Sequence, residues 1–179
     1  KSVCQAAKKF SYADEIEYLV LNESRNKFIS NLALSLKGNT LILYQYVEKH
    51  GAILYDMIST LSTDKKRKIF FVHGGTETED RENIRHIVEE EKNAIIVASY
   101  GCFSTGINIK NLHNLIFASP SKSRIRNLQS IGRGLRVSNT KTNAVLFDIA
   151  DDLRDKTKEN YTLRHFAERV KIYTEEKFS

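Results

Sequence analysis

The sequence predicts an α/β fold, in which a parallel β-sheet is flanked by helices and followed by a C-terminal helical extension. Five short apolar runs have the composition of buried parallel strands, and the segments between them repeat apolar residues at helical spacing. Parallel strands need long crossover connections, so this alternation is typical of a sheet with helices on both faces. The chain has 179 residues, 41% of them hydrophobic, which suffices for one core.

The N-terminal part contains one clear helix. Residues 1–21 are weakly patterned, and we interpret them as a connector whose apolar end, residues 18–21, forms a strand. Asn22 or Ser24 can cap the helix that follows, which ends near residue 36. Its apolar face consists of Phe28, Ile29, Leu32, Ala33 and Leu36.

The central part alternates regularly between strands and helices. Strands are predicted at residues 40–47, 68–73, 94–99, 115–118 and 144–147. Helices are predicted between the first three strands, at residues 48–61 and 78–91. Pro120 cannot donate to a sheet ladder and ends the fourth strand.

The C-terminal part changes character after the fifth strand. The four aspartates in it are interpreted as a solvated acidic turn rather than a metal site; they are Asp148, Asp151, Asp152 and Asp155. A charged helix with an apolar stripe follows at residues 160–177, and we expect it to pack on the sheet. The predicted organisation is a connector (1–21), a main domain (22–150) and a helical extension (151–179).

Positive charge is concentrated in one third of the chain. The formal net charge is +6, and residues 92–147 contain no acidic residue but eight lysines and arginines. Such a confined basic field indicates a polyanionic partner, either nucleic acid or nucleotide phosphates. A generally basic protein without such a partner is the alternative.

Two cysteines and the absence of long apolar runs restrict the setting. Cys4 and Cys102 lack the spacing of a zinc site or a disulfide framework, which favours a reducing, intracellular location. No run approaches the ~20 apolar residues of a membrane span. We expect a cytoplasmic protein of a bacterial or phage-infected cell. Because the sequence starts at Lys1, we expect the chain to be a fragment.

The most basic stretch is predicted to form a helix at residues 124–136. At about 100° per residue, its arginines and one glutamine share one side and its apolar residues another. The polar side carries Arg126, Gln129, Arg133 and Arg136. Gly132 and Gly134 weaken a helix, so we infer that something approaches closely there. Spacing alone leaves an ordinary solvated helix equally open.

Four predicted strand ends carry glycines and hydroxyl groups. They are residues 73–76, 99–101, 104–108 and 119–123. The carboxyl ends of parallel strands meet at one edge of a sheet, where backbone N–H groups can bind phosphate. Each loop alone is ordinary turn chemistry, but four on one edge favour phosphate binding. His73 can contact phosphate or cap its strand.

The order of these motifs resembles the second RecA-like motor domain of superfamily-two helicases. The matching residues run from the first strand through His73-Gly74 and Arg81 to Ser99, Thr105-Gly106-Ile107-Asn108 and Gln129-x-x-Gly132-Arg133-x-x-Arg136. They correspond to motifs IV, IVa, V and VI. The combination looks most like the phage UvsW recombination and branch-migration helicases, and Gly-Arg-x-Leu-Arg is also similar to the transcription-repair branch.

The resemblance implies that ATP and Mg²⁺ are held mainly by a first RecA-like domain, whose phosphate-binding motif G-x-x-x-x-G-K-[ST] this sequence does not contain. Arg133 and Arg136 correspond to arginine fingers, and Gln129 to a nucleotide sensor. Gly106, Asn108 and Gly132 correspond to nucleotide-contacting positions. Many relatives have Asp in place of Asn108.

The resemblance also implies contacts with the backbone of a DNA strand. They fall on His73, Gly74, Arg81, Ser99, Thr105 and Lys122. Contacts of this kind carry no sequence information, so binding is expected to be salt-dependent and nearly sequence-blind. Thr78 stands where the RNA-helicase branch has a glutamine, which favours DNA over RNA.

The function that follows is the C-terminal motor half of an ATP-dependent DNA helicase that acts on branched recombination or stalled-fork DNA. The chain alone is expected to be inactive, with the N-terminal RecA-like domain and DNA as its partners. Two alternatives stay open at this point. One is the motor half of a restriction or repair translocase, and the other is a non-catalytic nucleic-acid-binding module of the same fold.

Overall fold

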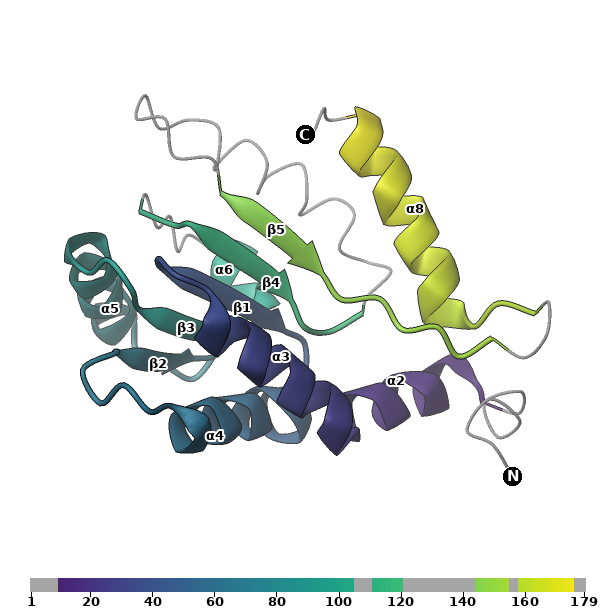
Figure 1. The fold of residues 1–179 in the computed structure, drawn as a ribbon, viewed down its shortest axis with the longest axis horizontal. Coiled ribbons are helices and arrows are strands. Elements are labelled where there is room, and N and C mark those ends of the chain that lie inside the picture. Colours follow the sequence, from purple (N-terminus) through teal and green to yellow (C-terminus); the bar gives the residue numbers. More distant parts are fainter. Residues whose placement is uncertain (1–9, 105–110, 121–143, 155–157, 176–179) are drawn as a thin grey trace.

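A parallel sheet of five strands forms the centre of the molecule (Figure 1). The computed structural model describes residues 10–104, 111–120, 144–154 and 158–175. The strands are β1 (Thr40–Tyr44), β2 (Ile69–Val72), β3 (Ile95–Ser99), β4 (Asn114–Phe117) and β5 (Val145–Asp148), in the spatial order β2-β3-β1-β4-β5. All four strand pairs are parallel. The predicted fold class and all five strands are confirmed.

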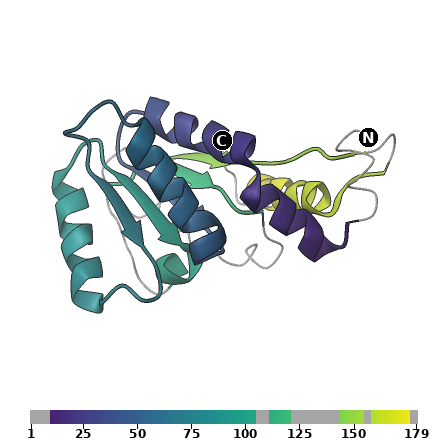
Figure 2. The ribbon, with the colours of Figure 1, turned by 90° about the horizontal axis from the view of Figure 1, so that it is seen from below.

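Helices cover both faces of the sheet (Figure 2). Alternate residues of β1 show the division, since Ile42 belongs to one apolar cluster and Leu43 to the other. The helices α3 (Glu23–Ser35) and α4 (Ala52–Leu61) contribute to the first cluster. The second includes residues of α5 (Thr78–Glu90), α6 (Tyr100–Ser104) and α8 (Tyr161–Glu175).

One helix starts irregularly. The predicted helix at 48–61 divides into a π-helical turn, η1 (Val47–Gly51), and α4. The N–H of Gly51 donates to the carbonyl of Tyr46, five residues earlier, at 2.9 Å. A Cβ at Gly51 would lie 2.4 Å from the Tyr44 ring, so this close approach requires glycine. Because η1 already begins at Val47, β1 is shorter than predicted and ends at Tyr44, three residues earlier.

The predicted strand at residues 18–21 is wrong. These residues belong to helix α2 (Tyr12–Leu21), which begins with a capping box between Ser11 and Asp14. Ile16, Leu19 and Val20 are buried at helical spacing. The acidic residues Asp14, Glu15 and Glu17 obscured this pattern, because Asp14 belongs to the capping box and Glu15 is buried.

The Glu15 side chain joins α2 to α8. Burying its charged carboxylate is costly unless hydrogen bonds satisfy it. Its oxygens accept hydrogen bonds from the backbone N–H groups of Tyr161 and Thr162 and from the side chain of Asn160. Burial raises the pKa of Glu15, but these hydrogen bonds outweigh burial and the pKa is lowered. The positive end of the α8 dipole also stabilises a carboxylate at the helix N-terminus. α2 and α8 consequently lie side by side (Figure 2).

The interpretation of residues 148–155 as a solvated acidic turn is wrong for two aspartates. Asp148 forms a buried ion pair with Arg169 of α8, at 2.6 Å, and accepts a hydrogen bond from Tyr173. Asp151 is paired with Arg25 of α3 at 2.9 Å. Asp152 keeps an exposed pair with Arg154, and Asp155 lies outside the described residues. The C-terminal helix lies at the β5 edge of the sheet, but mainly through Arg169 and Tyr173 and not through the predicted apolar stripe as a whole.

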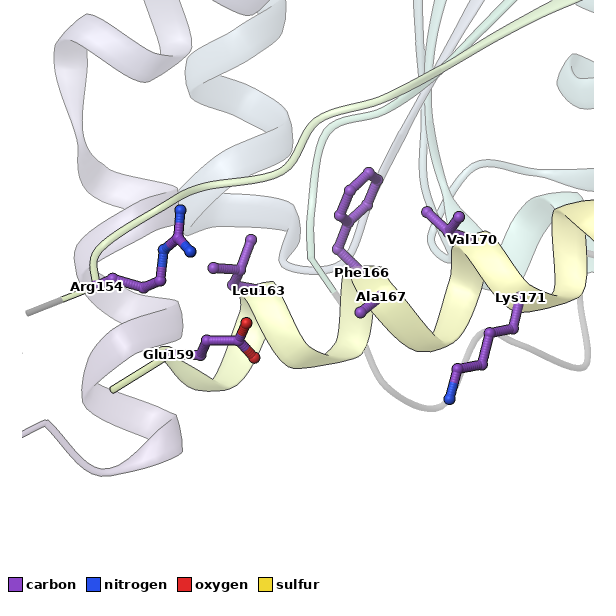
Figure 3. A pocket seen from close by; sticks show the side chains of 7 residues that line it. All are labelled: Arg154, Glu159, Leu163, Phe166, Ala167, Val170 and Lys171. Atoms are coloured by element: carbon purple, nitrogen blue, oxygen red, sulfur yellow. The ribbon is translucent and has the colours of Figure 1, made fainter. Parts of the chain in front are cut away.

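α8 and the segment before it line a shallow pocket of about 460 Å³, and Leu163, Phe166 and Val170 point from α8 toward the segment that carries Arg154 (Figure 3). Leu163, Phe166, Ala167 and Val170 form its apolar part, and Arg154, Glu159 and Lys171 its charged rim. No helix in the described part of the chain is long and apolar enough to cross a membrane.

Candidate nucleotide and nucleic-acid interface

Four of the twelve predicted site residues lie in the described part of the chain, namely His73, Gly74, Arg81 and Ser99. The other eight lie outside it: Thr105, Gly106, Asn108, Lys122, Gln129, Gly132, Arg133 and Arg136. Because the five strands are parallel, their carboxyl ends meet at one edge of the sheet, and the loops after β2 and β3 start there. The structure thus brings the His73 loop and Ser99 to the same edge.

The loop after β2 folds around His73. The backbone N–H of His73 donates to the Thr76 hydroxyl at 3.1 Å, and the Gly75 N–H donates to the imidazole Nδ1 at 3.1 Å. A neutral imidazole has one donor and one acceptor nitrogen. Since Nδ1 accepts, Nε2 carries the proton and is the nitrogen that can donate to an anion.

Arg81 braces this loop from the first turn of α5. Its Nε donates to the Thr76 carbonyl at 2.8 Å, and its Nη2 donates to the Gly74 carbonyl at 2.9 Å. Gly74 is exposed, and a Cβ there would meet no atom within 4 Å. The backbone of the loop is therefore held in place and open to a ligand. The direct phosphate contacts expected of Arg81 and Gly74 stay predictions.

Ser99 ends β3 and starts α6. Its hydroxyl donates to the Cys102 sulfur at 3.2 Å and accepts the Cys102 backbone N–H at 3.3 Å. The side chain caps the short helix and is largely buried. Its expected contact with a DNA strand stays a prediction.

A buried polar relay behind the strand ends was not predicted from the sequence. It consists of Asn26 on α3, His50 on η1 and Ser119 after β4, all at most 2% exposed. His50 Nδ1 lies 2.7 Å from the Ser119 hydroxyl, and His50 Nε2 lies 3.1 Å from Asn26 Oδ1. The Asn26 amide group donates to the Val20 carbonyl at 2.8 Å, and the Gln45 N–H donates to the Ser119 hydroxyl at 3.0 Å.

These partners fix the direction of every hydrogen bond in the relay. Because Asn26 donates through Nδ2, its Oδ1 must accept, and His50 Nε2 must be the donor. His50 Nδ1 then accepts from the Ser119 hydroxyl. Burial, assisted by the nearby Arg25 charge, lowers the pKa of His50 to about 3. His50 is therefore neutral at physiological pH.

The lowered pKa predicts a loss of stability in mild acid. Unfolded, His50 titrates near 6.5, so between about pH 6.5 and pH 3 the unfolded chain binds the additional proton. The free energy of unfolding is expected to fall by about 2 kcal/mol between pH 7 and pH 5 through His50 alone. Urea unfolding of the wild type and of His50→Gln at both pH values measures this. An equal loss in both proteins would contradict the assignment, because all other groups are shared.

The end of β4 is held from several sides. Arg25 Nη1 donates to the Ala118 carbonyl at 2.8 Å, and the Tyr100 hydroxyl donates to the Ser119 carbonyl at 3.1 Å. The Ala118 N–H donates to the Leu43 carbonyl of β1. Residues of α3, η1, α6 and β1 thus converge on Ala118 and Ser119. The relay partners of His50 are 24 and 69 residues away in the sequence, so no local motif could reveal them.

Comparison with known proteins identifies the family. Residues 23–138 match the model of the helicase conserved C-terminal domain. The chain is 37% identical to the ATP-dependent DNA helicase uvsW of Enterobacteria phage T4, over 94% of this chain and 35% of that protein. The chain thus spans about a third of the length of this relative.

Solved structures agree with the sequence comparison. The crystal structure of T4 UvsW matches 98% of this chain with a TM-score of 0.81 and 35% identity, and 37% of that chain is covered. The C-terminal part of the Fun30 ATPase domain matches 95% of this chain and 59% of its own, with a TM-score of 0.58 and 17% identity. This second likeness shows the shared fold alone.

Proposed function

The chain belongs to the family of helicase conserved C-terminal domains, and from this premise we propose that it is the C-terminal motor half of an ATP-dependent DNA helicase or translocase acting on branched recombination or stalled-fork DNA. The observation that carries the proposal is the 37% identity to the T4 DNA helicase over nearly the whole chain. Residues 22–150 form the motor domain, residues 1–21 lead from the first motor domain, and residues 151–179 are its helical extension. Its place of action is the cytoplasm of a bacterium or a phage-infected cell.

Nucleotide chemistry in this proposal depends on two domains. The phosphate loop and the Mg²⁺-binding carboxylates lie on an N-terminal RecA-like domain, and the described residues hold no cluster of three metal-ligating side chains. Arg133 and Arg136 reach the nucleotide phosphates across the domain boundary, where a guanidinium stabilises charge that develops during phosphoryl transfer. Gln129 senses the nucleotide. Gly106, Asn108 and Gly132 line the same site.

DNA contacts follow the carboxyl edge of the sheet. The His73 imidazole has its Nε2 proton available for a phosphate oxygen, since Nδ1 is occupied by the Gly75 N–H. Gly74 leaves its backbone open, and Arg81 keeps the loop in shape. The proposal assigns further contacts with the DNA backbone to Ser99, Thr105 and Lys122. All of these address phosphate and sugar groups, so affinity falls with salt and hardly depends on sequence.

The test uses both the complete protein and the isolated chain. We expect the complete protein to couple ATP hydrolysis to unwinding of forked and Holliday-junction DNA in preference to linear duplex. We expect the 179-residue chain to hydrolyse no ATP. Magnesium-dependent hydrolysis by the chain alone would refute the two-domain proposal. Preference for linear duplex would favour a restriction or repair translocase, and absence of any ATPase in the complete protein would favour a binding module.

A further inference from the structure

We propose that His50 is a positioning residue of the motor domain: through Ser119 it fixes the end of β4 relative to α2, and so the point from which the chain proceeds to Arg133. This inference rests on the proposed function, because it assigns a use to the relay of Asn26, His50 and Ser119 in placing the arginine fingers. Ser119 stands fourteen residues before Arg133 in the sequence.

The relay is continuous and has one direction. Starting from the Gln45 N–H, each group donates to the next, through Ser119, His50 and Asn26 to the Val20 carbonyl in α2. Ser119 and its donor Gln45 follow the ends of the neighbouring strands β4 and β1. The relay therefore connects the carboxyl edge of the sheet to the helix that precedes the domain core.

In this arrangement every polar group of the relay has a hydrogen-bond partner. The single hydroxyl of Ser119 accepts one hydrogen bond and donates another, and the neutral imidazole uses both of its nitrogens. Shifting Ser119 out of place leaves His50 Nδ1 without this partner in a dry interior, which is costly. A buried polar network of this kind specifies one geometry more sharply than apolar packing does.

The backbone that carries His50 is itself unusual. The π-helical turn η1 places His50 inward, and it requires a glycine at position 51 because the Tyr44 ring occupies the adjacent space. π-helical turns are rare and occur frequently at functional sites. An apolar side chain on a regular helix would provide a stable core here without either irregularity. A role in positioning thus explains the buried histidine better than a role in stability does.

Three variants of the complete protein test the proposal. His50→Leu removes both ring nitrogens, Ser119→Ala removes one oxygen atom, and His50→Gln keeps one donor and one acceptor. We expect His50→Leu and Ser119→Ala each to lower the kcat of DNA-stimulated ATP hydrolysis about tenfold or more, with the KM for ATP and the DNA affinity changed less than about threefold. His50→Gln should recover most of the kcat. The double variant should be no slower than the slower single one, because both act on one relay.

A matched control separates positioning from stability. Ile58 is buried in the same apolar cluster and does not belong to the relay, so Ile58→Val or Ile58→Ala, chosen to match the thermal midpoint of His50→Leu, should keep the wild-type kcat. An equal loss of kcat in this control, or an unchanged kcat in His50→Leu, would overturn the proposal. If His50→Leu does not fold, Ser119→Ala decides alone.

A spectroscopic measurement keeps the inference distinct from the proposed function. In NMR spectra of the 179-residue chain, His50→Leu should shift the backbone amide signals of residues 121–136, whereas the Ile58 control should not. This result needs no ATP hydrolysis. If the complete protein lacks ATPase activity, the proposed function fails and the amide shifts still decide the inference; unshifted signals would refute it.

Discussion

In the complete enzyme, Arg133→Ala is expected to lower DNA-stimulated ATP hydrolysis by about 10³-fold or more at saturating ATP and DNA. The reason is electrostatic, because a finger guanidinium stabilises charge that is present only in the transition state. Losing it should lower kcat and kcat/KM together while DNA binding stays close to the wild type. Steady-state ATPase assays and fluorescence anisotropy with a forked DNA measure the two quantities.

Arg124→Ala is the matched control for this experiment. It removes the same charge from the same basic stretch, but Arg124 does not belong to the Gln129-x-x-Gly132-Arg133-x-x-Arg136 pattern. At saturating DNA its turnover should remain near the wild-type value. Unchanged turnover in Arg133→Ala would remove the finger assignment, and an equal loss in both variants would reduce it to a general effect of positive charge.

The second large effect is expected on stability. Arg169→Met should lower the free energy of unfolding by about 3–5 kcal/mol, because it leaves the Asp148 carboxylate buried without its cation. The two side chains are only 4% and 6% exposed, and the guanidinium donates to both carboxylate oxygens. Methionine keeps most of the buried stem, so the loss reports the charge rather than packing. Urea denaturation of the chain at pH 7 measures it.

Two companion variants make the result specific. Arg154→Ala breaks the exposed pair with Asp152 and should leave the unfolding midpoint unchanged, since solvent already screens that pair. The double variant Asp148→Leu/Arg169→Met should recover much of the stability, because it leaves no unpaired charge. A loss in the double variant as large as in Arg169→Met would show that packing, and not the buried charge, is responsible.

The parts of the fold that could be predicted are those governed by local apolar patterns. β1, β3 and β4 are buried throughout, so their apolar runs are continuous, and α3 begins at the predicted cap, Asn22. α2 was missed because Glu15 is charged yet buried, and its donors lie 145 to 147 residues away. The π-helical turn was missed because the apolar spacing of residues 53–61 continues regularly behind it, and only the close approach of Gly51 to the Tyr44 ring marks its end.

The candidate site also has a part that could be predicted from the sequence and a part that could not. The ordered motifs were sufficient to predict the family, because each is short and has a fixed spacing that can be read from the sequence. What the individual side chains do could not be predicted so well. Arg81 braces a loop through two carbonyl groups, and Ser99 caps α6. The Ser99 cap follows the usual spacing of an N-cap, but the Arg81 contacts depend on how the loop after β2 folds back, which no spacing rule describes.

The hydrogen bonds of Glu15 that join α2 to α8 have a mechanical consequence. A force applied to α2 passes through the Glu15 carboxylate to the first residues of α8, and from Arg169 to Asp148 at the end of β5. The two helices come from opposite ends of the chain, yet they are expected to turn as one lever against the sheet. A displacement of α2 is thus expected to reach the edge strand β5 through α8.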